Sequence, residues 1–444
     1  MKNSLKIIIA ILLLLPGLAF AGDFVCRQIG ETSGGGDLVL APGRNDGVNR
    51  LYVNGAGMFE YSWQDSVWHK DTLEAVSGWV HKAVAAGFGR NDGICRIYAR
   101  WPLGLCEYTY NGGVWTKVMI DNLNLEGNAI ALGDIKNDDT IRVVAGIWDS
   151  LIVAYTYQSA GNTWKAETLG TTNNEIHGIT VGQGRNDDTN RVYTGGWNAR
   201  FYEYWYQSGV WNKYSLGYSY CSTIGDARND GINRLYLEGL AEFTWETDHW
   251  TFNSMDTNSS SYSGRTVLSN GRNDGRNRLY VASDLRESAD SVGYANAYIL
   301  EKTYDSLTGW TRKELQAVAI GDPVPLDYIA AGQARNDGVN RIYGHYYYGE
   351  LFEFTWADTI NGVEQGVKDI NVLNVGKALK VKPNPFYSYA AISNLPSDVE
   401  LKIYDITGRL VEKTNSTKAG AKLNAGVYFV TAGGYKPAKM VKIK

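Results

Sequence analysis

The sequence predicts an all-β protein in which a four-stranded unit is repeated seven times. A segment of the form (Arg/Lys)-Asn-Asp-(Gly/Asp)-x-x-Arg recurs, and its aspartate returns at intervals of 46, 46, 49, 43, 44 and 63 residues. Apart from the last interval, which contains an insertion, these match the period of roughly 40–50 residues typical of a propeller blade. Fifty glycines and thirty tyrosines fit a chain rich in turns and strands. We therefore predict a seven-bladed β-propeller over residues 22–362.

Residues 1–21 have the pattern of a cleaved export signal. Lys2 and Lys6 flank the start of an apolar run at residues 7–15, and small residues precede the expected cut after Ala21. This run is shorter than the roughly 20 residues needed to cross a bilayer, and no second long apolar stretch follows. Gly22 rather than a cysteine follows the cut, which argues against a lipoprotein. We expect an extracellular or cell-surface protein without a transmembrane segment.

Charge and cysteine content exclude some classes of partner. The net charge of −4 is small and dispersed, so we expect neither nucleic acid nor anionic lipid as a partner. The four cysteines have neither the spacing of a metal-binding motif nor the density of a disulfide scaffold. Free, partly buried thiols are the simplest interpretation, although the compartment permits disulfides. These cysteines are Cys26, Cys95, Cys106 and Cys221.

Each period is expected to contain four short strands. A strand of small residues, such as residues 83–87, precedes the Asn-Asp turn and suits the crowded wall of a central channel. A second strand follows the turn, and a third alternates polar and aromatic residues, as in Glu60-Tyr61-Ser62-Trp63. A tryptophan opens the fourth strand in six periods. The seventh lacks it, so we predict that residues 24–29 complete that blade and close the ring.

The recurring turn also suggests a structural role for its charged residues. Asn, Asp and Gly are the residues of tight turns. Each turn aspartate is followed four residues later by an arginine, and we predict that the pair braces the turn. The pairs are Asp46 and Arg50, Asp92 and Arg96, Asp138 and Arg142, Asp187 and Arg191, Asp230 and Arg234, Asp274 and Arg278, and Asp337 and Arg341.

The same loops are weakly similar to the calcium-binding turns of FG-GAP or VCBS propeller repeats. That resemblance implies oxygen ligands at alternate positions, but only Asp134 and Asp226 retain the first acid. The third position is always Arg or Lys, which would repel a metal ion. We therefore expect no cofactor, with Ca²⁺ disfavoured and Asp134 and Asp226 as the weak candidates. A ring of seven identical small ligand sites remains the alternative to a structural role.

The opposite face should carry the variable loops, which are the expected place for a ligand. Aromatic side chains beside polar ones suit carbohydrate, and they also suit a protein epitope. Packing between blades, or ordinary rim histidines, would explain the same residues without a ligand. The candidates are Trp79, His81, Trp101, Trp148, His177, Trp197, Tyr346 and Tyr347.

Three functions remain open on this sequence. The first is lectin-like recognition of an extracellular glycan, and the second is a protein-interaction or adhesion module. The third is a polysaccharide-degrading lyase or glycosidase, but no catalytic motif is present. Asp37, Glu175 and Asp327 are carboxylates that could meet at the channel mouth. We favour binding over catalysis.

The last 66 residues have a different character. After a linker at residues 363–378, the segment 379–444 contains Lys382-Pro383-Asn384-Pro385, Tyr404-Asp405-x-x-Gly408-Arg409 and Ala425-Gly426-Val427-Tyr428-Phe429-Val430, and it ends in lysines. In that order the motifs closely resemble the type A C-terminal sorting domain of the type IX secretion system. The resemblance implies a small Ig-like β-sandwich that interacts with the type IX machinery. An ordinary Ig-like module without a sorting role is the alternative.

Overall fold

The computed structural model describes most of the chain in separate ranges. These are residues 24–32, 34–75, 83–101, 104–122, 129–147, 150–196, 200–218, 223–237, 241–255, 265–285, 296–315, 326–346, 349–356, 379–393, 401–405, 410–432 and 438–443. The predicted signal peptide and linker therefore lie outside the described residues. Within these ranges, no helix has both the length and the apolar character of a membrane span.

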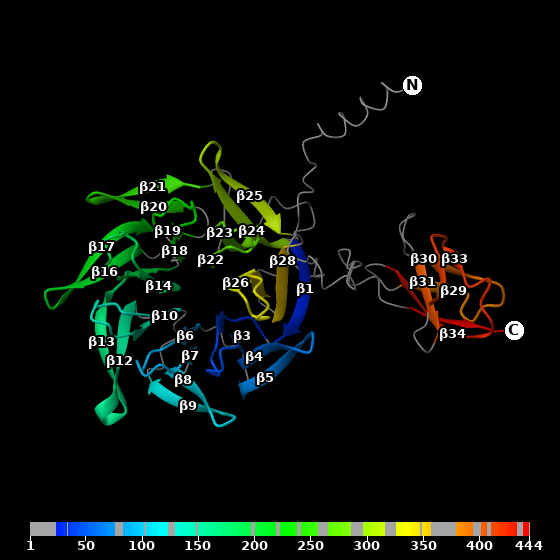
Figure 1. Cartoon of the computed structure of the whole chain (residues 1–444), viewed down its shortest axis with the longest axis horizontal. Coiled ribbons are helices and arrows are strands. Elements are labelled where there is room, and N and C mark those ends of the chain that lie inside the picture. Colours follow the sequence, from blue (N-terminus) through cyan, green and yellow to red (C-terminus); the bar gives the residue numbers. More distant parts are fainter. Residues whose placement is uncertain are drawn as a thin grey trace, which may run out of the picture. The chain divides into compact units, whose positions relative to one another are not determined.

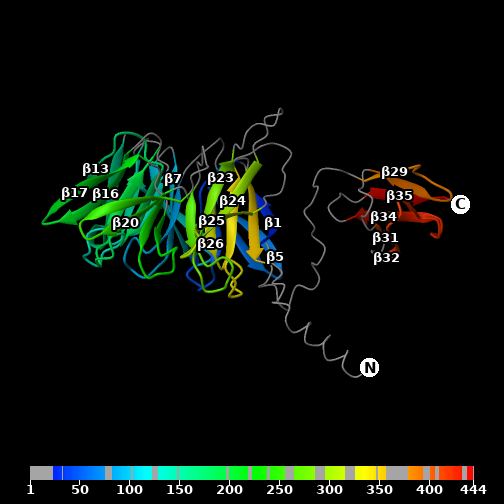
Figure 2. The same ribbon diagram turned by 90° about the horizontal axis from the view of Figure 1, so that it is seen from above.

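Seven antiparallel four-stranded sheets form the propeller, as predicted (Figure 1). The innermost strands touch in sequence order: β2 (Leu38–Ala41) touches β6 (Val84–Gly87), β6 touches β10 (Ala129–Gly133), and so on to β26 (Leu326–Gly332), which returns to β2. Seen edge-on, the sheets stand side by side around the ring (Figure 2). The chain thus forms a closed circle of blades.

The strand bounds follow the repeat. Blade 1 contains β2 (Leu38–Ala41), β3 (Arg50–Gly55), β4 (Gly57–Gln64) and β5 (Val67–Ala75). Blade 2 contains β6 (Val84–Gly87), β7 (Arg96–Trp101), β8 (Gly104–Asn111) and β9 (Val114–Asp121). Blade 3 contains β10 (Ala129–Gly133), β11 (Arg142–Gly146), β12 (Leu151–Gln158) and β13 (Thr163–Thr171), with the 3-10 turn η1 (Ser159–Gly161). Blade 4 contains β14 (Gly178–Gly182), β15 (Arg191–Gly195), β16 (Arg200–Gln207) and β17 (Val210–Tyr218).

The remaining blades have the same order. Blade 5 contains β18 (Thr223–Gly225), β19 (Arg234–Leu237), β20 (Ala241–Glu246) and β21 (His249–Ser254). Blade 6 contains β22 (Thr266–Ser269), β23 (Arg278–Leu285), β24 (Asn296–Asp305) and β25 (Gly309–Leu315). Blade 7 contains β26 (Leu326–Gly332), β27 (Arg341–Tyr346) and β28 (Glu350–Trp356), and its outer strand is β1 (Phe24–Glu31).

The ring closes by pairing the two ends of the propeller. β1 runs antiparallel to β28, with Phe24 opposite Trp356 and Glu31 opposite Glu350. This pairing confirms the predicted closure and satisfies an edge that would otherwise expose unpaired backbone groups.

Small residues line the channel because neighbouring inner strands lie close together. A Cβ atom added at Gly133 would come within 2.4 Å of Val181 Cγ1 in the next blade. The third strands are buried, and their aromatic side chains fill the space between blades, as Tyr108 does with Tyr52 and Met58. Small residues therefore lie on the innermost strand of each blade, and aromatic residues lie on its third strand.

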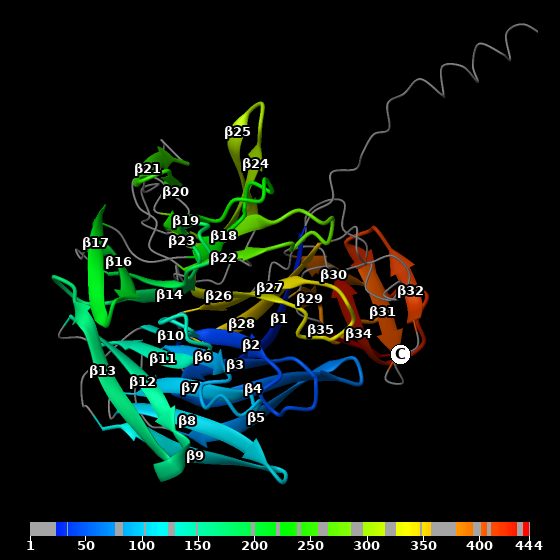
Figure 3. The ribbon, with the colours of Figure 1, turned by 60° about the vertical axis from the view of Figure 1, so that its left-hand side comes forward.

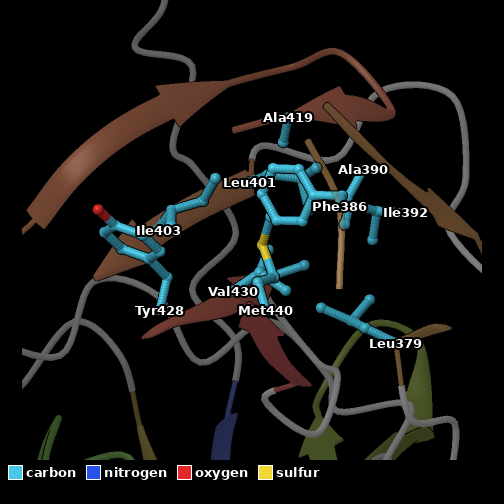
Figure 4. Packing of buried hydrophobic residues seen from close by; sticks show 11 residues of the cluster. Leu379, Phe386, Ala390, Ile392, Leu401, Ile403, Ala419, Tyr428, Val430 and Met440 are labelled. Carbon is cyan, nitrogen blue, oxygen red and sulfur yellow. The ribbon is translucent and has the colours of Figure 1, made fainter. Parts of the chain in front are cut away.

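The C-terminal domain has two sheets, β29 (Lys380–Lys382), β30 (Ala390–Ser393) and β33 (Lys418–Ala419), and β32 (Leu410–Thr414), β31 (Leu401–Asp405), β34 (Gly426–Ala432) and β35 (Ala438–Lys442). Phe386 and Met440, both fully buried, lie at the centre of its core (Figure 4). The amide of Asn384 receives a hydrogen bond from Val441 N and donates one to Lys439 O. The Pro-Asn-Pro motif thereby holds the last strand in place.

Candidate functional site

The recurring turns connect the first and second strands of every blade, and we call the face that carries them the turn face. In blade 1, Arg50 donates to both carboxylate oxygens of Asp46, at 2.8 and 2.7 Å. These hydrogen bonds lower the pKa of Asp46 to about 2. The same ion pair forms in each of the seven turns. The other pairs are Asp92–Arg96, Asp138–Arg142, Asp187–Arg191, Asp230–Arg234, Asp274–Arg278 and Asp337–Arg341.

The turn asparagine joins each blade to the next. Asn45 has a left-handed backbone, with φ of 60°, and its amide bonds Cys95 N and Cys95 O of blade 2, at 2.6 and 3.0 Å. Asparagine tolerates this backbone conformation better than most residues. The six equivalent contacts join Asn91 to Ile141, Asn137 to Asn190, Asn186 to Asn233, Asn229 to Asn277, Asn273 to Asn340, and Asn336 to Asn49.

The cation at the third position of the loop also crosses to the next blade. Arg44 forms an ion pair of 2.6 Å with Glu60, which is fully buried, and its guanidinium lies 4.8 Å from the ring centroid of Tyr110 in blade 2. Such cation–π stacking strengthens when the groups are desolvated. The equivalent cation and ring pairs are Arg90 with Tyr157, Lys136 with Tyr206, Arg185 with Trp245, Arg228 with Tyr304, Arg272 with Trp356, and Arg335 with Trp63.

The acids of the weak calcium candidates also take part in the turn. Asp134 accepts hydrogen bonds from Asp138 N and Asp139 N, at 3.1 and 2.8 Å. Asp226 accepts the equivalent bonds from Asp230 N and Gly231 N. The turn face thus combines ion pairs, asparagine contacts and stacked cations that hold neighbouring blades together.

The opposite face differs from blade to blade. The residue before the innermost strand is Asp37 in blade 1, His177 in blade 4 and Arg265 in blade 6. The backbone places these residues equivalently, since Asp37 O accepts from Asn54 N and Arg265 O accepts from Ala282 N. His177 occupies the same place in blade 4, because it directly precedes Gly178, which pairs with Gly195 at the start of β14. One position of the repeat therefore presents an acid, an imidazole and a guanidinium around the ring.

Asp37 and Arg265 form an ion pair that passes over blade 7. Arg265 Nη1 lies 2.9 Å from Asp37 Oδ2, and its guanidinium lies 5.1 Å from the ring centroid of Tyr328. Val84 N of blade 2 also donates to Asp37. Burial raises the pKa of Asp37, an effect that Arg265 opposes. The buried carboxylate thus ties three blades together, while Arg265 remains about one third exposed.

His177 and Glu175 form a second polar group on this face. His177 Nε2 lies 3.0 Å from Glu175 Oε2, and each side chain is 26% exposed. Asn174 and Thr172 order the preceding loop, because Asn174 accepts from Glu175 N and Thr172 donates to Asn174 O. The pair offers a hydrogen-bond donor and an acceptor to solvent from an ordered loop.

The structure corrects two of the sequence-predicted ligand residues. Trp101 is 3% exposed and donates to Tyr108 Oη at 2.8 Å, and Tyr346 is 2% exposed and packs on Phe352. Both end a second strand and point into the core, so they are packing residues and not loop residues. Trp79, His81, Trp148, Trp197 and Tyr347 lie outside the described residues, as does the side chain of Asp327.

Sequence reasoning did not foresee that Arg265 pairs with Asp37 or that its guanidinium lies over Tyr328. The signal that could have found Arg265 is its place directly before a small-residue strand, which matches the position of Asp37 in its own period. Cys95 and Cys106 are free, buried thiols, in agreement with the simplest interpretation of the sequence, and Cys221 lies outside the described residues.

Comparisons with known proteins support the assignment of both the C-terminal domain and the propeller fold. Residues 380–443 match the secretion system C-terminal sorting domain family. The fold resembles the crystal structure of BBS1N in complex with ARL6DN, soaked with mercury, with a TM-score of 0.50 and 13% identity over 76% of this chain and 97% of that one. The lead-soaked crystal of the same complex has a TM-score of 0.49 and 13% sequence identity, over 77% of this chain and 98% of that one. At this identity the likeness shows the fold alone. No curated protein sequence matches the chain.

These findings define the class of protein. It is a β-propeller with a type IX sorting domain, which indicates export to the cell surface or the extracellular space and interaction with the type IX machinery.

Proposed function

We propose that the protein is an exported carbohydrate-binding propeller that holds a glycan on the face carrying Asp37, His177 and Arg265. A signal peptide at residues 1–21 would start this export, and the sorting domain would complete it. Binding of the glycan needs no metal ion and no catalytic step.

One contrast between the two faces carries the proposal. On the turn face the repeated polar groups bond the neighbouring blades, so they are already satisfied within the scaffold. On the opposite face one equivalent position holds three different polar side chains, of which Asp37 is buried and joins blades, whereas His177 and Arg265 are partly exposed. Variable side chains on a rigid scaffold are the usual arrangement of a binding site.

The chemistry of these groups suits a sugar. His177 and Glu175 are partly exposed and offer hydrogen bonds of both kinds to hydroxyl groups. Arg265 adds further donors, and its guanidinium is held over Tyr328 and against Asp37. A site in which polar groups are already oriented loses less entropy when it binds a ligand.

A glycan-array assay on the mature full-length chain tests the proposal, with and without EDTA. We expect binding that EDTA leaves unchanged and that His177→Ala weakens by at least about fivefold, or about 1 kcal/mol. Ile232→Ala changes an exposed residue of the turn face and serves as the matched control.

Three outcomes would contradict the proposal. Loss of binding in EDTA would indicate a metal-dependent site, and loss in Ile232→Ala alone would place the site on the turn face. Absence of binding to every glycan would exclude carbohydrate and favour an extracellular protein as the partner.

A further inference from the structure

A cleft of about 690 Å³ opens between blades 5 and 6. Its described walls come from the turn residue Arg228, from the end of β21 and the residue after it, and from the hairpin formed by β24 and β25. Figure 3 shows this hairpin beside β20 and β21. The volume lies within the range of roughly 300–1,000 Å³ typical of small-molecule sites.

The chain departs from its repeat at this junction. In the other six blades an aromatic residue follows the buried position of the third strand, and in four of them its hydroxyl reaches the outer strand of the preceding blade. Those four are Tyr61 with Glu31, Tyr108 with Glu74, Tyr155 with Asp121, and Tyr204 with Thr171. Blade 6 has Lys302 at this position, and the facing outer strand, β21, has six residues where those of blades 1–4 have eight or nine. We attribute the cleft to this departure.

The charges around the cleft are engaged within the protein. Arg228 forms an ion pair with Glu242, which is fully buried. Arg312 Nη2 lies 4.0 Å from Glu314 Oε1. Lys302 is only 1% exposed, so it presents almost no surface to a ligand. Charge therefore does not select what the cleft can hold.

The hydroxyl of Tyr304 retains a donor that its counterpart in blade 3 has used. Tyr304 Oη accepts a hydrogen bond from Arg228 Nη1 at 3.2 Å, and its own proton has no acceptor among the described residues. Tyr157 holds the same place in blade 3, but its hydroxyl both accepts from Arg90 and donates to Asn162, at 3.0 and 2.6 Å. The donor of Tyr304 is thus available to a ligand in the cleft.

Two further neutral groups in the wall can bond a ligand. The side-chain amide of Asn253 lines the cleft and makes no hydrogen bond to another side chain or backbone group in the described part of the chain. The hydroxyl of Thr311 donates to Thr303 O at 3.2 Å, so its oxygen can still accept. Amide and hydroxyl groups of this kind match the hydroxyl groups of a neutral, polyhydroxylated molecule.

An aromatic ring completes the wall. Trp310 lines the cleft, and it is held between Tyr304 and Tyr236, whose ring centroids lie 5.3 and 5.9 Å from its own. A fixed aromatic surface beside hydrogen-bonding groups suits a sugar, which has an apolar ring face and polar edges. Because these side chains are already ordered, binding costs little further entropy.

We propose that this cleft is a second carbohydrate site, which binds a neutral oligosaccharide. Tyr304 and Asn253 hydrogen-bond its hydroxyl groups, and Trp310 packs against the face of one sugar ring. The site shares no residue with the one at Asp37, His177 and Arg265, so the inference does not depend on the proposed function.

Isothermal titration of the mature full-length chain tests the inference with maltotriose, cellotriose and xylotriose, and with trigalacturonate as the acidic comparison. We expect at least one neutral trisaccharide to bind with a Kd below about 1 mM. Its affinity should change less than about twofold as salt is added, because a neutral ligand has no charge to screen. The titrations are repeated in His177→Ala, so that binding at the other site does not contribute.

Tyr304→Phe and Asn253→Ala should each weaken this binding about fivefold or more, since each removes a hydrogen bond to the ligand. Tyr157→Phe is the matched control and should leave the affinity unchanged, because Tyr157 lies at the junction of blades 2 and 3. Asn253 is exposed, so Asn253→Ala remains a valid test if Tyr304→Phe is less stable.

Four outcomes would overturn the inference. They are no binding of any neutral trisaccharide, tighter binding of trigalacturonate than of all three, unchanged affinity in both cleft variants, and an equal loss in Tyr157→Phe. Loss of all binding in His177→Ala would also overturn it, while supporting the site at Asp37, His177 and Arg265. Failure here is thereby distinguished from failure of the proposed function.

Discussion

Asn336 in blade 7 bonds both backbone groups of Asn49 in blade 1, at 2.7 Å to Asn49 N and 3.0 Å to Asn49 O. The same contact links every other pair of neighbouring blades, but this one joins residues 287 positions apart. The pairing of β1 with β28 inside blade 7 also ties the N-terminal strand of the propeller to its last strand. Two independent sets of hydrogen bonds therefore hold the two ends of the propeller together.

We predict that Asn336→Ala lowers the free energy of unfolding by about 2–3 kcal/mol, because it removes two hydrogen bonds and places alanine in a left-handed conformation. Asn336→Gly should cost about half as much, since glycine tolerates the positive φ of 58°. Urea unfolding measures both. Lys165→Ala, at an exposed position on β13, should stay within about 0.5 kcal/mol of wild type. An equal loss of unfolding free energy in the Ala and Gly variants would show that the left-handed backbone at this position does not disfavour alanine.

Blade 3 contains a compensated exchange of charges. In the other six blades the third strand carries a buried glutamate, such as Glu60 in blade 1. Ala154 occupies this position in blade 3, and Glu167 lies directly opposite it on the neighbouring strand. Lys136 pairs with Glu167 at 2.7 Å, and Trp211 also donates to that carboxylate. The acid has thus moved to the adjacent strand without losing its cation.

We predict that Glu167→Gln destabilises the protein by about 1 kcal/mol, allowing for its partial exposure. Adding Ala154→Glu should recover most of that loss, because it restores the arrangement of the other blades. A thermodynamic cycle from urea midpoints checks the coupling. No recovery in the double variant would mean that the two positions do not share the role.

His345 makes stability depend on pH in a window of its own. Burial lowers the pKa of His345 to about 4, and its ring bonds Thr32 and Gly36 beside the closing strand. The unfolded chain takes up this proton near pH 6.5, so acidification from about 6.5 to 4 favours unfolding by up to about 3 kcal/mol. We predict that His345→Gln flattens urea stability across this window. His249→Gln, at an exposed position, should reproduce the wild-type curve.

The turn aspartates act at lower pH. Their arginine partners hold the pKa values of Asp46 and Asp138 at about 2, below the unfolded value near 4. The contribution of these ion pairs to the free energy of unfolding is complete above pH 4 and is lost as pH falls through about 2. Stability measured from pH 4 to 2 should therefore fall further, and the slope should be smaller in Asp138→Asn. An identical slope in that variant would show that this aspartate does not contribute.

Removal of residues 379–444 should stop the propeller from reaching the outer surface or the medium, because the matched sorting region is lost. Immunoblots of fractions from the producing bacterium measure this. Phe386→Ala, which removes a fully buried ring from the domain core, should cause similar retention. Surface levels equal to wild type in the truncated chain would contradict the assignment.

The repeat was sufficient to predict the blades, because each period carries its own turn and its own strand pattern. The closing strand followed from counting strands. The sorting domain was predictable because its motifs are specific, and the matching family confirms it.

Side-chain roles were harder to predict. Trp101 and Tyr346 were assigned to loops because strand ends are uncertain by two or three residues, and that error decides between core and surface. The third-position cations were judged only as groups unfit for calcium. Their stacking on the next blade depends on contacts about 70 residues away, as between Arg90 and Tyr157, which a local pattern does not reveal.

The pairing of β1 with β28 has a consequence for the order of events during synthesis. Strand β1 is made first but has no partner until the ribosome has passed Trp356, so the ring stays open until almost the whole propeller exists. The sorting domain is translated only afterwards. A chain that displays a finished sorting domain therefore already contains every strand that the ring needs.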